Sequence, residues 1–259
     1  MASPTVNLTL SADQQPPSTY MGLTRTATYG FLSALPLILL YEALIIVANG
    51  GRAGEIRVSS EVWLKEILAS MGAQSMHVLA GIVIVIGFGI VIYERKKDIP
   101  IRLSYFIGMM IESMLYAVLV AMLVSEIVWR LFDPTAIQTG IIAQVEMGDL
   151  WTQIALSIGA GIYEELVFRV IVVGGVYLFL HALFGFKTLA YLIAAVSGAF
   201  LFSLVHYIGP LGDTFTLASF AFRFLFGLAL NVLYLTRGFG VAAWTHALYD
   251  IMIVTHLLG

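Results

Sequence analysis

The sequence contains no cysteine, so disulfides, thiolate metal ligands and a cysteine nucleophile are all excluded. Charge is also scarce: 11% of the 259 residues are charged, against about 25% in an average soluble domain. Thirteen basic and sixteen acidic residues give a formal net charge of -3, so the chain has no basic field that would attract nucleic acid. These scarcities argue against a water-soluble globule and against a nucleic-acid partner.

Apolar residues take the place of the missing charge and make up 60% of the chain. Runs at 27–48, 76–93 and 103–128 are each close to the roughly 20 residues that a membrane-spanning helix needs. Beyond Trp151 the chain is almost continuously apolar, and we divide it at its polar points into five further segments. The division points are Arg169, Lys187, the stretch 206–213 and Arg237. The sequence thus predicts an all-α, polytopic transmembrane helical bundle of about eight membrane helices, surrounded by membrane lipids.

Three regions follow from this pattern. Residues 1–20 are polar and proline-rich, which predicts a disordered N-terminal tail. Residues 21–150 are expected to hold the N-terminal membrane helices, with an amphipathic interfacial helix near 60–71 where apolar and charged residues alternate. Residues 151–259 form a C-terminal membrane region. The whole is expected to be a multi-pass integral membrane protein, in the cell membrane if the source is bacterial.

The C-terminal region carries ionisable residues at membrane depth, where such groups are costly and mark candidate functional sites. Glu165 and Arg169 are four residues apart and can pair on one helix face. Glu164 points about 100° away, so it can face a cavity while Glu165 is tied to arginine. A carboxylate in such a cavity suits a general base.

Two histidines on separate segments complete the candidate site. His246 and Asp250 are four residues apart, so the carboxyl can fix the imidazole tautomer or, when protonated, donate a hydrogen bond. Together with His206 and Glu164 they would make a water-activating site. Simpler interpretations remain: Glu165–Arg169 as a structural pair, and His206 bonded to a carbonyl. Structural roles are also expected for four other ionisable residues in apolar segments. The glutamates would bond neighbouring helices or sit near the interfaces, and the arginine would extend to the interface: Glu42, Glu112, Glu126 and Arg223.

Three motifs in this region resemble those of the CPBP family, which includes the type II CAAX prenyl endopeptidases and the abortive-infection (Abi) proteins. EELVFR at 164–169 is similar to its EExxxR motif, and FSLVH at 202–206 to its FxxxH motif. HALYD at 246–250 is similar to its third motif, HxxxN or HxxxD. The resemblance covers roughly 150–256, and three motifs in order at suitable separations are specific.

The resemblance implies an intramembrane endopeptidase that cuts a membrane-embedded or lipidated protein. It assigns Glu164 as the base that activates water, with His206 beside it. It assigns His246 and position 250 to stabilising the oxyanion, and Glu165 and Arg169 to supporting the site. Prenyl endopeptidases typically carry asparagine where this chain has Asp250, so that donor role needs a protonated aspartate.

Alternatives stay open at this stage. Zinc held by Glu164, His206 and His246 is the mechanistic rival, although metal-free glutamate catalysis is favoured and the sequence has no HExxH pair. A non-catalytic CPBP-like protein with an immunity or scaffold role would keep the same motifs. A proton-coupled transporter using Glu42, Glu112 and Glu126 is the third interpretation, and we find no internal repeat that favours it.

Overall fold

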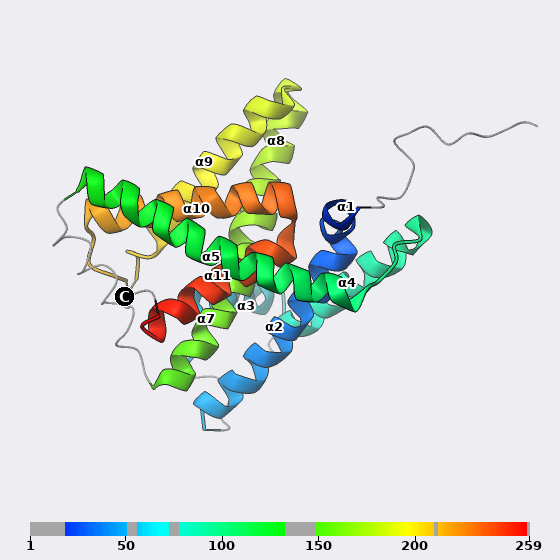
Figure 1. The fold of residues 1–259 in the computed structure, drawn as a ribbon, viewed down its shortest axis with the longest axis horizontal. Coiled ribbons are helices and arrows are strands. Elements are labelled where there is room, and N and C mark those ends of the chain that lie inside the picture. The colour runs from blue at the N-terminus through cyan, green and yellow to red at the C-terminus, as the bar shows by residue number, and fades with distance from the viewer. Residues whose placement is uncertain (1–18, 51–55, 73–77, 133–148, 210–211, 258–259) are drawn as a thin grey trace, which may run out of the picture.

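The computed structural model describes residues 19–50, 56–72, 78–132, 149–209 and 212–257, and all the regular structure in that part of the chain is helical (Figure 1). The tail expected over 1–20 lies outside the described residues up to residue 18. The α-helices are α1 (Tyr20–Thr24), α2 (Ala27–Ala48), α3 (Ser59–Ser70), α4 (Val78–Glu94), α5 (Leu103–Leu131), α7 (Leu150–Glu165), α8 (Gly174–Phe184), α9 (Lys187–Val205), α10 (Leu217–Arg237) and α11 (Phe239–Val254).

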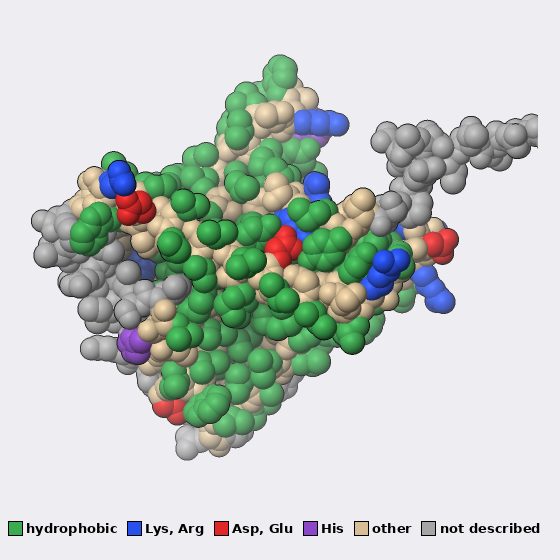
Figure 2. Space-filling view, viewed as in Figure 1, with side chains coloured by type: hydrophobic (Ala, Val, Ile, Leu, Met, Phe, Trp, Pro, Cys, Tyr) green, Lys and Arg blue, Asp and Glu red, His purple; other side chains and the backbone are tan. Residues whose placement is uncertain are grey.

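Six helical stretches are long and apolar enough to cross a membrane. They are Ala27–Ala48, Val78–Lys97, Leu103–Leu131, Leu150–Phe184, Lys187–Val205 and Leu217–Arg237, and α11 is a shorter apolar helix. Hydrophobic side chains cover most of the visible face, as lipid contact requires (Figure 2). The expected fold class is confirmed: the protein is an all-α, multi-pass integral membrane protein.

One expected boundary is wrong, because the chain does not break at Arg169. A π-helical stretch, Leu166–Val173, joins α7 to α8, and the Gly174 amide bonds to the Arg169 carbonyl. The result is one continuous helix of 35 residues from Leu150 to Phe184. At 1.5 Å per residue it is about 50 Å long, more than the roughly 30 Å of a bilayer core. A single π-turn inside a long helix is often found at a functional site.

The short helix α11 lies at the centre of the bundle. It packs against α7, α5, α2 and α10, and Figure 1 shows it passing behind α5. Ala243 and Ala247 face a cluster built largely from α2 and α7. Tyr249 and Met252 belong to a second cluster with α5, α9 and α10. Because both clusters cover α11, its polar residues are held inside protein rather than against lipid.

Side-chain caps set where two of the surrounding helices begin. Asp149 precedes α7 and accepts a 2.8 Å hydrogen bond from the Thr152 amide, which satisfies one free N–H of the first turn. The hydrogen bonds from Thr152 also hold the pKa of Asp149 below its usual range. Thr216 caps α10 in the same way, accepting from the Ser219 amide at 3.1 Å. The start of α7, the helix that carries Glu164 and Glu165, is therefore fixed by a side-chain cap.

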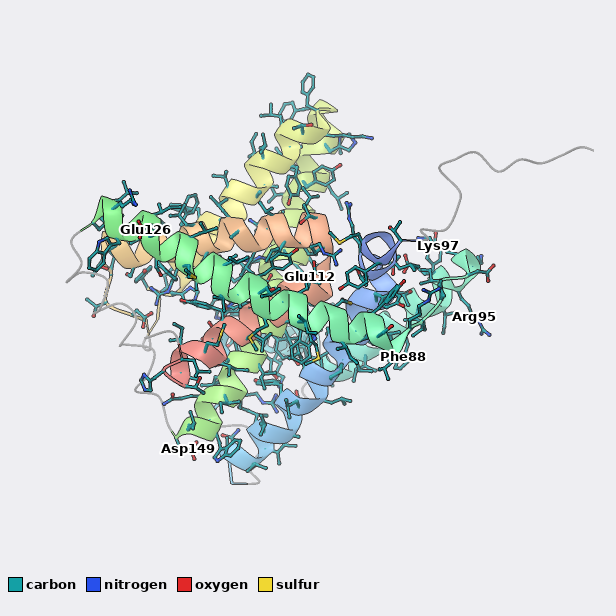
Figure 3. The ribbon with its side chains drawn as sticks, in the orientation of Figure 1. Phe88, Arg95, Lys97, Glu112, Glu126 and Asp149 are labelled. Carbon is teal, nitrogen blue, oxygen red and sulfur yellow. The ribbon has the colours of Figure 1, made fainter. Side chains whose placement is uncertain are left out.

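The three glutamates of the N-terminal half bond to neighbours. Both carboxylate oxygens of Glu42 accept from Arg57, at 3.1 and 3.2 Å. Glu126 pairs with Arg130 at an exposed part of α5. Glu112 lies in the first half of α5 (Figure 3) and binds Arg237 of α10 at 2.5 Å. These contacts match the simple interpretation, in which the glutamates connect helices or sit near an interface.

Candidate active site

The EExxxR motif forms a buried ion pair at the junction of α7 and the π-helical stretch. Arg169 Nη1 lies 2.9 Å from Glu165 Oε1, and both side chains are at most 1% exposed. A second guanidinium nitrogen, Nη2, donates to the Gly227 carbonyl of α10 at 3.3 Å. The guanidinium also lies 4.7 Å from the ring centre of Phe202 on α9. Arg169 thus connects α7, α9 and α10 around one fixed carboxylate.

His246 of α11 is held by that same carboxylate. Its Nδ1 lies 2.8 Å from Glu165 Oε1, so Glu165 bonds both Arg169 and the imidazole. Its other nitrogen, Nε2, lies 3.5 Å from Asp250 Oδ2 and 3.9 Å from Glu164 Oε2. Glu165, rather than Asp250, is thus the carboxylate within hydrogen-bond distance of the His246 ring.

His206 ends α9 and shows the carbonyl bond that the simple interpretation expected. Its Nδ1 lies 2.7 Å from the Phe202 carbonyl. Because a carbonyl can only accept, Nδ1 carries the proton and Nε2 is left for the cavity that His206 lines. His206 thus makes a structural hydrogen bond and also lines the candidate site.

Two phenylalanines fill the space between the polar groups. The Phe202 ring is 2% exposed and lies between the histidines, 5.1 Å from the His206 ring and 5.8 Å from the His246 ring. Phe226 of α10 covers His246 from another side at 5.5 Å. Phe202 is therefore a packing residue at the centre of the site. Phe226 lies in the stretch 222–246, which also resembles the CPBP family, but spacing along the sequence does not indicate that it would cover His246.

All four predicted catalytic residues line one cavity of about 560 Å³. Glu164 and Asp250 enter it with 15% and 20% of their side chains exposed. Glu165 and Arg169 are behind this surface and support it. Apolar residues from α7, α10 and α11 make up much of the remaining lining: Leu156, Ala160, Phe222, Ile253 and Val254. The cavity combines apolar side chains with a cluster of carboxylates and imidazoles.

A polar loop after α9 adds residues that sequence reasoning missed. Arg223, which the sequence suggested would extend to the interface, forms an ion pair with Asp213 and donates to the Tyr207 hydroxyl at 2.7 Å. The Asp213 amide in turn bonds to the His206 carbonyl at 2.8 Å. This network holds the loop, and with it His206, against α10. An arginine ten residues after an aspartate was the only signal in the sequence.

The site's donors were compared with what a zinc ion needs. Among the residues that the structure describes, no group of three or more His, Asp or Glu side chains is arranged to hold a metal ion. The bonds of Nδ1 of His246 to Glu165 and of Nδ1 of His206 to the Phe202 carbonyl leave only the two Nε2 atoms for other partners. Because the described side chains are not arranged around a common metal position, no metal-bound step is derived.

The fold and this cavity define a polytopic membrane protein with a buried carboxylate–histidine site. Residues 146–252 match the family model described as type II CAAX prenyl endopeptidase Rce1-like, a range that takes in all three motifs. The match supports CPBP family membership for this region, as the motifs predicted, and at family level it supports a CAAX-type intramembrane protease. No curated protein and no solved structure matches the chain.

Proposed function

We propose that the protein is an intramembrane endopeptidase that uses Glu164 to activate water and hydrolyses a peptide bond of a membrane-embedded or lipidated protein. The observation that carries this proposal is the placement of Glu164, His206, His246 and Asp250 around a single cavity at the core of the bundle. Polar groups in that number are expensive at membrane depth unless the site uses them.

The chemistry can be written from the residues present. Glu164 takes a proton from water while the water oxygen bonds to the scissile carbonyl carbon. The carbonyl oxygen becomes an oxyanion in a tetrahedral intermediate. When the intermediate collapses, the C–N bond breaks and Glu164 returns the proton to the leaving amine. His206, with Nε2 left for the cavity, is placed to hold the water beside Glu164.

His246 and Asp250 supply the oxyanion's hydrogen bonds in this scheme. For His246 to donate from Nε2, both ring nitrogens must carry protons, since Nδ1 is already bonded to Glu165. Carboxylates on both sides of the ring, from Glu165, Glu164 and Asp250, favour that charged form. Asp250 can add a second donor only while it is protonated.

The cavity lining and the family match support a membrane-embedded or lipidated peptide as the substrate class. An apolar lining beside the carboxylates suits a peptide with apolar side chains or an attached lipid. Two probes separate these cases: an internally quenched farnesylated peptide with a CAAX-type C-terminus, and an internally quenched, unprenylated single-span peptide. Mass spectrometry of what co-purifies with the Glu164→Gln variant identifies the native substrate.

The central experiment measures cleavage of both probes by purified protein in liposomes. Glu164→Gln, His206→Ala and His246→Ala should each lower kcat by about 10²-fold or more, without loss of the folded state by circular dichroism. Cleavage that persists in all three variants, or no cleavage by wild type of either probe, would favour a non-catalytic role such as immunity or scaffolding.

Metal dependence is tested on the same preparation. Metal-free catalysis predicts that dialysis against a chelator leaves kcat unchanged and that elemental analysis finds no stoichiometric zinc. Zinc that is present at one per chain, with activity lost on chelation and restored by zinc, would replace the proposed mechanism.

A further inference from the structure

The cavity has one wall that lies far from the three motifs in sequence. Arg57, Val58, Ser59 and Trp63 line it together with Glu164 and His246. These four residues lie in and just before α3, outside the region 146–252 that matches the family model. We call this stretch, 57–63, the α3 wall. Part of the N-terminal half therefore lines the same cavity as the three motifs.

An ion-pair network fixes the α3 wall in place. Arg57 bonds both oxygens of Glu42 on α2 and also Glu61 Oε1, at 2.5 Å, on α3. Glu61 is fully buried and is shared with Lys65 and the Tyr41 hydroxyl. A carboxylate that accepts bonds from several charged donors fixes the positions of those donors relative to one another. The wall is therefore tied to α2 by charge.

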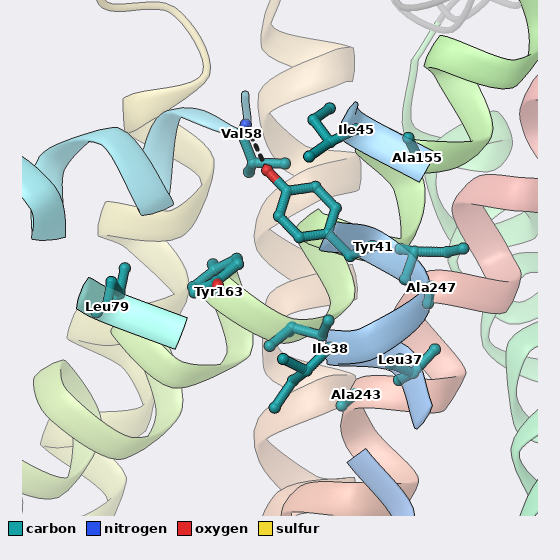
Figure 4. Packing of buried hydrophobic residues seen from close by; sticks show 12 residues of the cluster. Leu37, Ile38, Tyr41, Ile45, Val58, Leu79, Ala155, Tyr163, Ala243 and Ala247 are labelled. Atoms are coloured by element: carbon teal, nitrogen blue, oxygen red, sulfur yellow. Dashed lines mark hydrogen bonds between the residues drawn. The ribbon is translucent and has the colours of Figure 1, made fainter. Parts of the chain in front are cut away.

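The α3 wall also packs closely against α7, the helix that carries Glu164. The Tyr41 hydroxyl approaches the Val58 amide, and the Tyr41 ring packs edge-to-face on Tyr163, the neighbour of Glu164 (Figure 4). A Cβ atom at Gly159 would lie 2.5 Å from the Tyr41 ring and 2.6 Å from Val58. Only glycine at this position allows α2 and the wall to approach α7 so closely, just over one turn before Glu164.

The wall offers the cavity an apolar surface rather than a charge. Arg57 is matched by two carboxylates and its side chain is 3% exposed, so it is committed to the network. Trp63 is 37% exposed, and its indole is the large apolar group of the wall. Leu156 and Ala160 of α7 continue the same lining toward Glu164. An apolar side chain of a bound peptide would complete this surface.

From this geometry we infer that the α3 wall is a substrate-binding surface of the active site, where Trp63 packs against an apolar side chain of the peptide beside the scissile bond. The inference rests on the proposed peptidase function. It makes the N-terminal half part of the specificity machinery and assigns it no catalytic step. Trp63 acts on binding, so its loss should change KM and leave kcat intact.

The first test uses the absence of native cysteine. Single substitutions Ser59→Cys, on the wall, and Ser70→Cys, exposed at the far end of α3, are made in the inactive Glu164→Gln protein. Labelling by a water-soluble maleimide is timed with and without the farnesylated peptide. Peptide at ten times its Kd should slow labelling of the Ser59→Cys variant about tenfold, since only the free fraction reacts. The Ser70→Cys variant should be unaffected.

The second test is kinetic. Trp63→Ala should raise KM for the cleaved probe about tenfold and keep kcat within about twofold of wild type. Ile67→Ala, one turn further along α3 and outside the cavity lining, is the matched control and should change neither constant.

Failure of the peptidase proposal and failure of the α3-wall inference give different results in these experiments. If wild type cleaves neither probe, the peptidase proposal fails. If wild type cleaves but the peptide does not protect the Ser59→Cys variant, or Trp63→Ala leaves KM unchanged, the α3 wall is structural and this inference is wrong. Protection at both Ser59 and Ser70 would also overturn it, because the effect would then not be local.

Discussion

The Nδ1 atom of His246 lies 2.8 Å from Oε1 of Glu165, the oxygen that also binds Arg169. This shared oxygen places the second glutamate of the motif behind the site, where it orients the imidazole. Glu164, its neighbour in sequence, is turned into the cavity. Two adjacent glutamates therefore have different surroundings, and each should respond differently to the same conservative substitution.

Glu165→Gln should lower kcat about 10²-fold or more, with little change in KM, because an amide no longer provides the charge that keeps His246 oriented and protonated. Steady-state cleavage of the quenched peptide measures this. Tyr163→Phe is a matched control, since the buried Tyr163 hydroxyl makes no hydrogen bond within the described part of the chain. An unchanged kcat in Glu165→Gln would show that the contact is only structural.

Asp250 is the position where this chain departs from the asparagine of prenyl endopeptidases. If Asp250 donates to the oxyanion, it does so only while protonated, so activity should fall as pH rises through its titration. Asp250→Asn donates at every pH and should keep wild-type kcat at low pH. It should remove the part of the alkaline decline that comes from Asp250 and leave the part that comes from deprotonation of His246. Asp250→Ala should lose about 10²-fold in kcat at all pH values, as loss of an oxyanion donor does.

A pH–kcat profile of the three proteins decides the role of Asp250. An Asp250→Asn protein as inactive as Asp250→Ala would show that the carboxylate form is required. In that case Asp250 would act by its negative charge near His246 Nε2, 3.5 Å away, rather than as a donor.

Membrane class, the three-motif order and the Glu165–Arg169 pairing could be read from local spacing, because hydropathy and helical period are sequence properties. Whether α7 ends at Arg169 could not, since a π-turn preserves the helix with no breaker residue. Nor could the partner of His246: Asp250 was one helical turn away, but Glu165 came from another helix, and spacing says nothing about such contacts.

The α3 wall illustrates the same limit. Trp63 was expected in an interfacial helix near 60–71, and nothing within 57–63 indicated a place in this cavity. The place of the wall depends on Gly159, which lets α2 and the wall reach α7. A glycine among 24 gives no local sign of which neighbour it admits. Only the tertiary packing shows that Gly159 lies against Tyr41 and Val58.

Glu112 is predicted to matter for stability and not for catalysis. It accepts from Arg237, Tyr20 and Tyr116, and it ties α5 to α10 and α1. Burial and the Glu112 bond raise the pKa of Tyr20 to about 12, so Tyr20 stays a donor. Glu112→Ala should destabilise the fold by about 3–5 kcal/mol, because the buried Arg237 loses its carboxylate and keeps only neutral acceptors, the Thr24 hydroxyl and the Met21 carbonyl.

Thermal unfolding in detergent, with kcat measured below the transition, tests this role. Glu126→Ala is the control: its side chain is 57% exposed and should change neither property. Proton flux in liposomes that depends on Glu112 and Glu126 would contradict the structural role and support the transport alternative.

Gly161 sets the distance between the helix that carries Glu164 and the helix that carries His246. A Cβ atom there would lie 2.6 Å from both the Ala243 carbonyl oxygen and the Ala247 Cβ of α11. Because one of these is backbone, α11 must move as a whole. Gly161→Ala should therefore lower both Tm and kcat, the latter by about 10²-fold, since a displacement near 1 Å can cost that much. Gly175→Ala, on the same long helix, is the control: a Cβ there meets no described atom within 4 Å beyond its own turn. Equal behaviour of the two variants would mean that α7 and α11 need not approach this closely for the site to work.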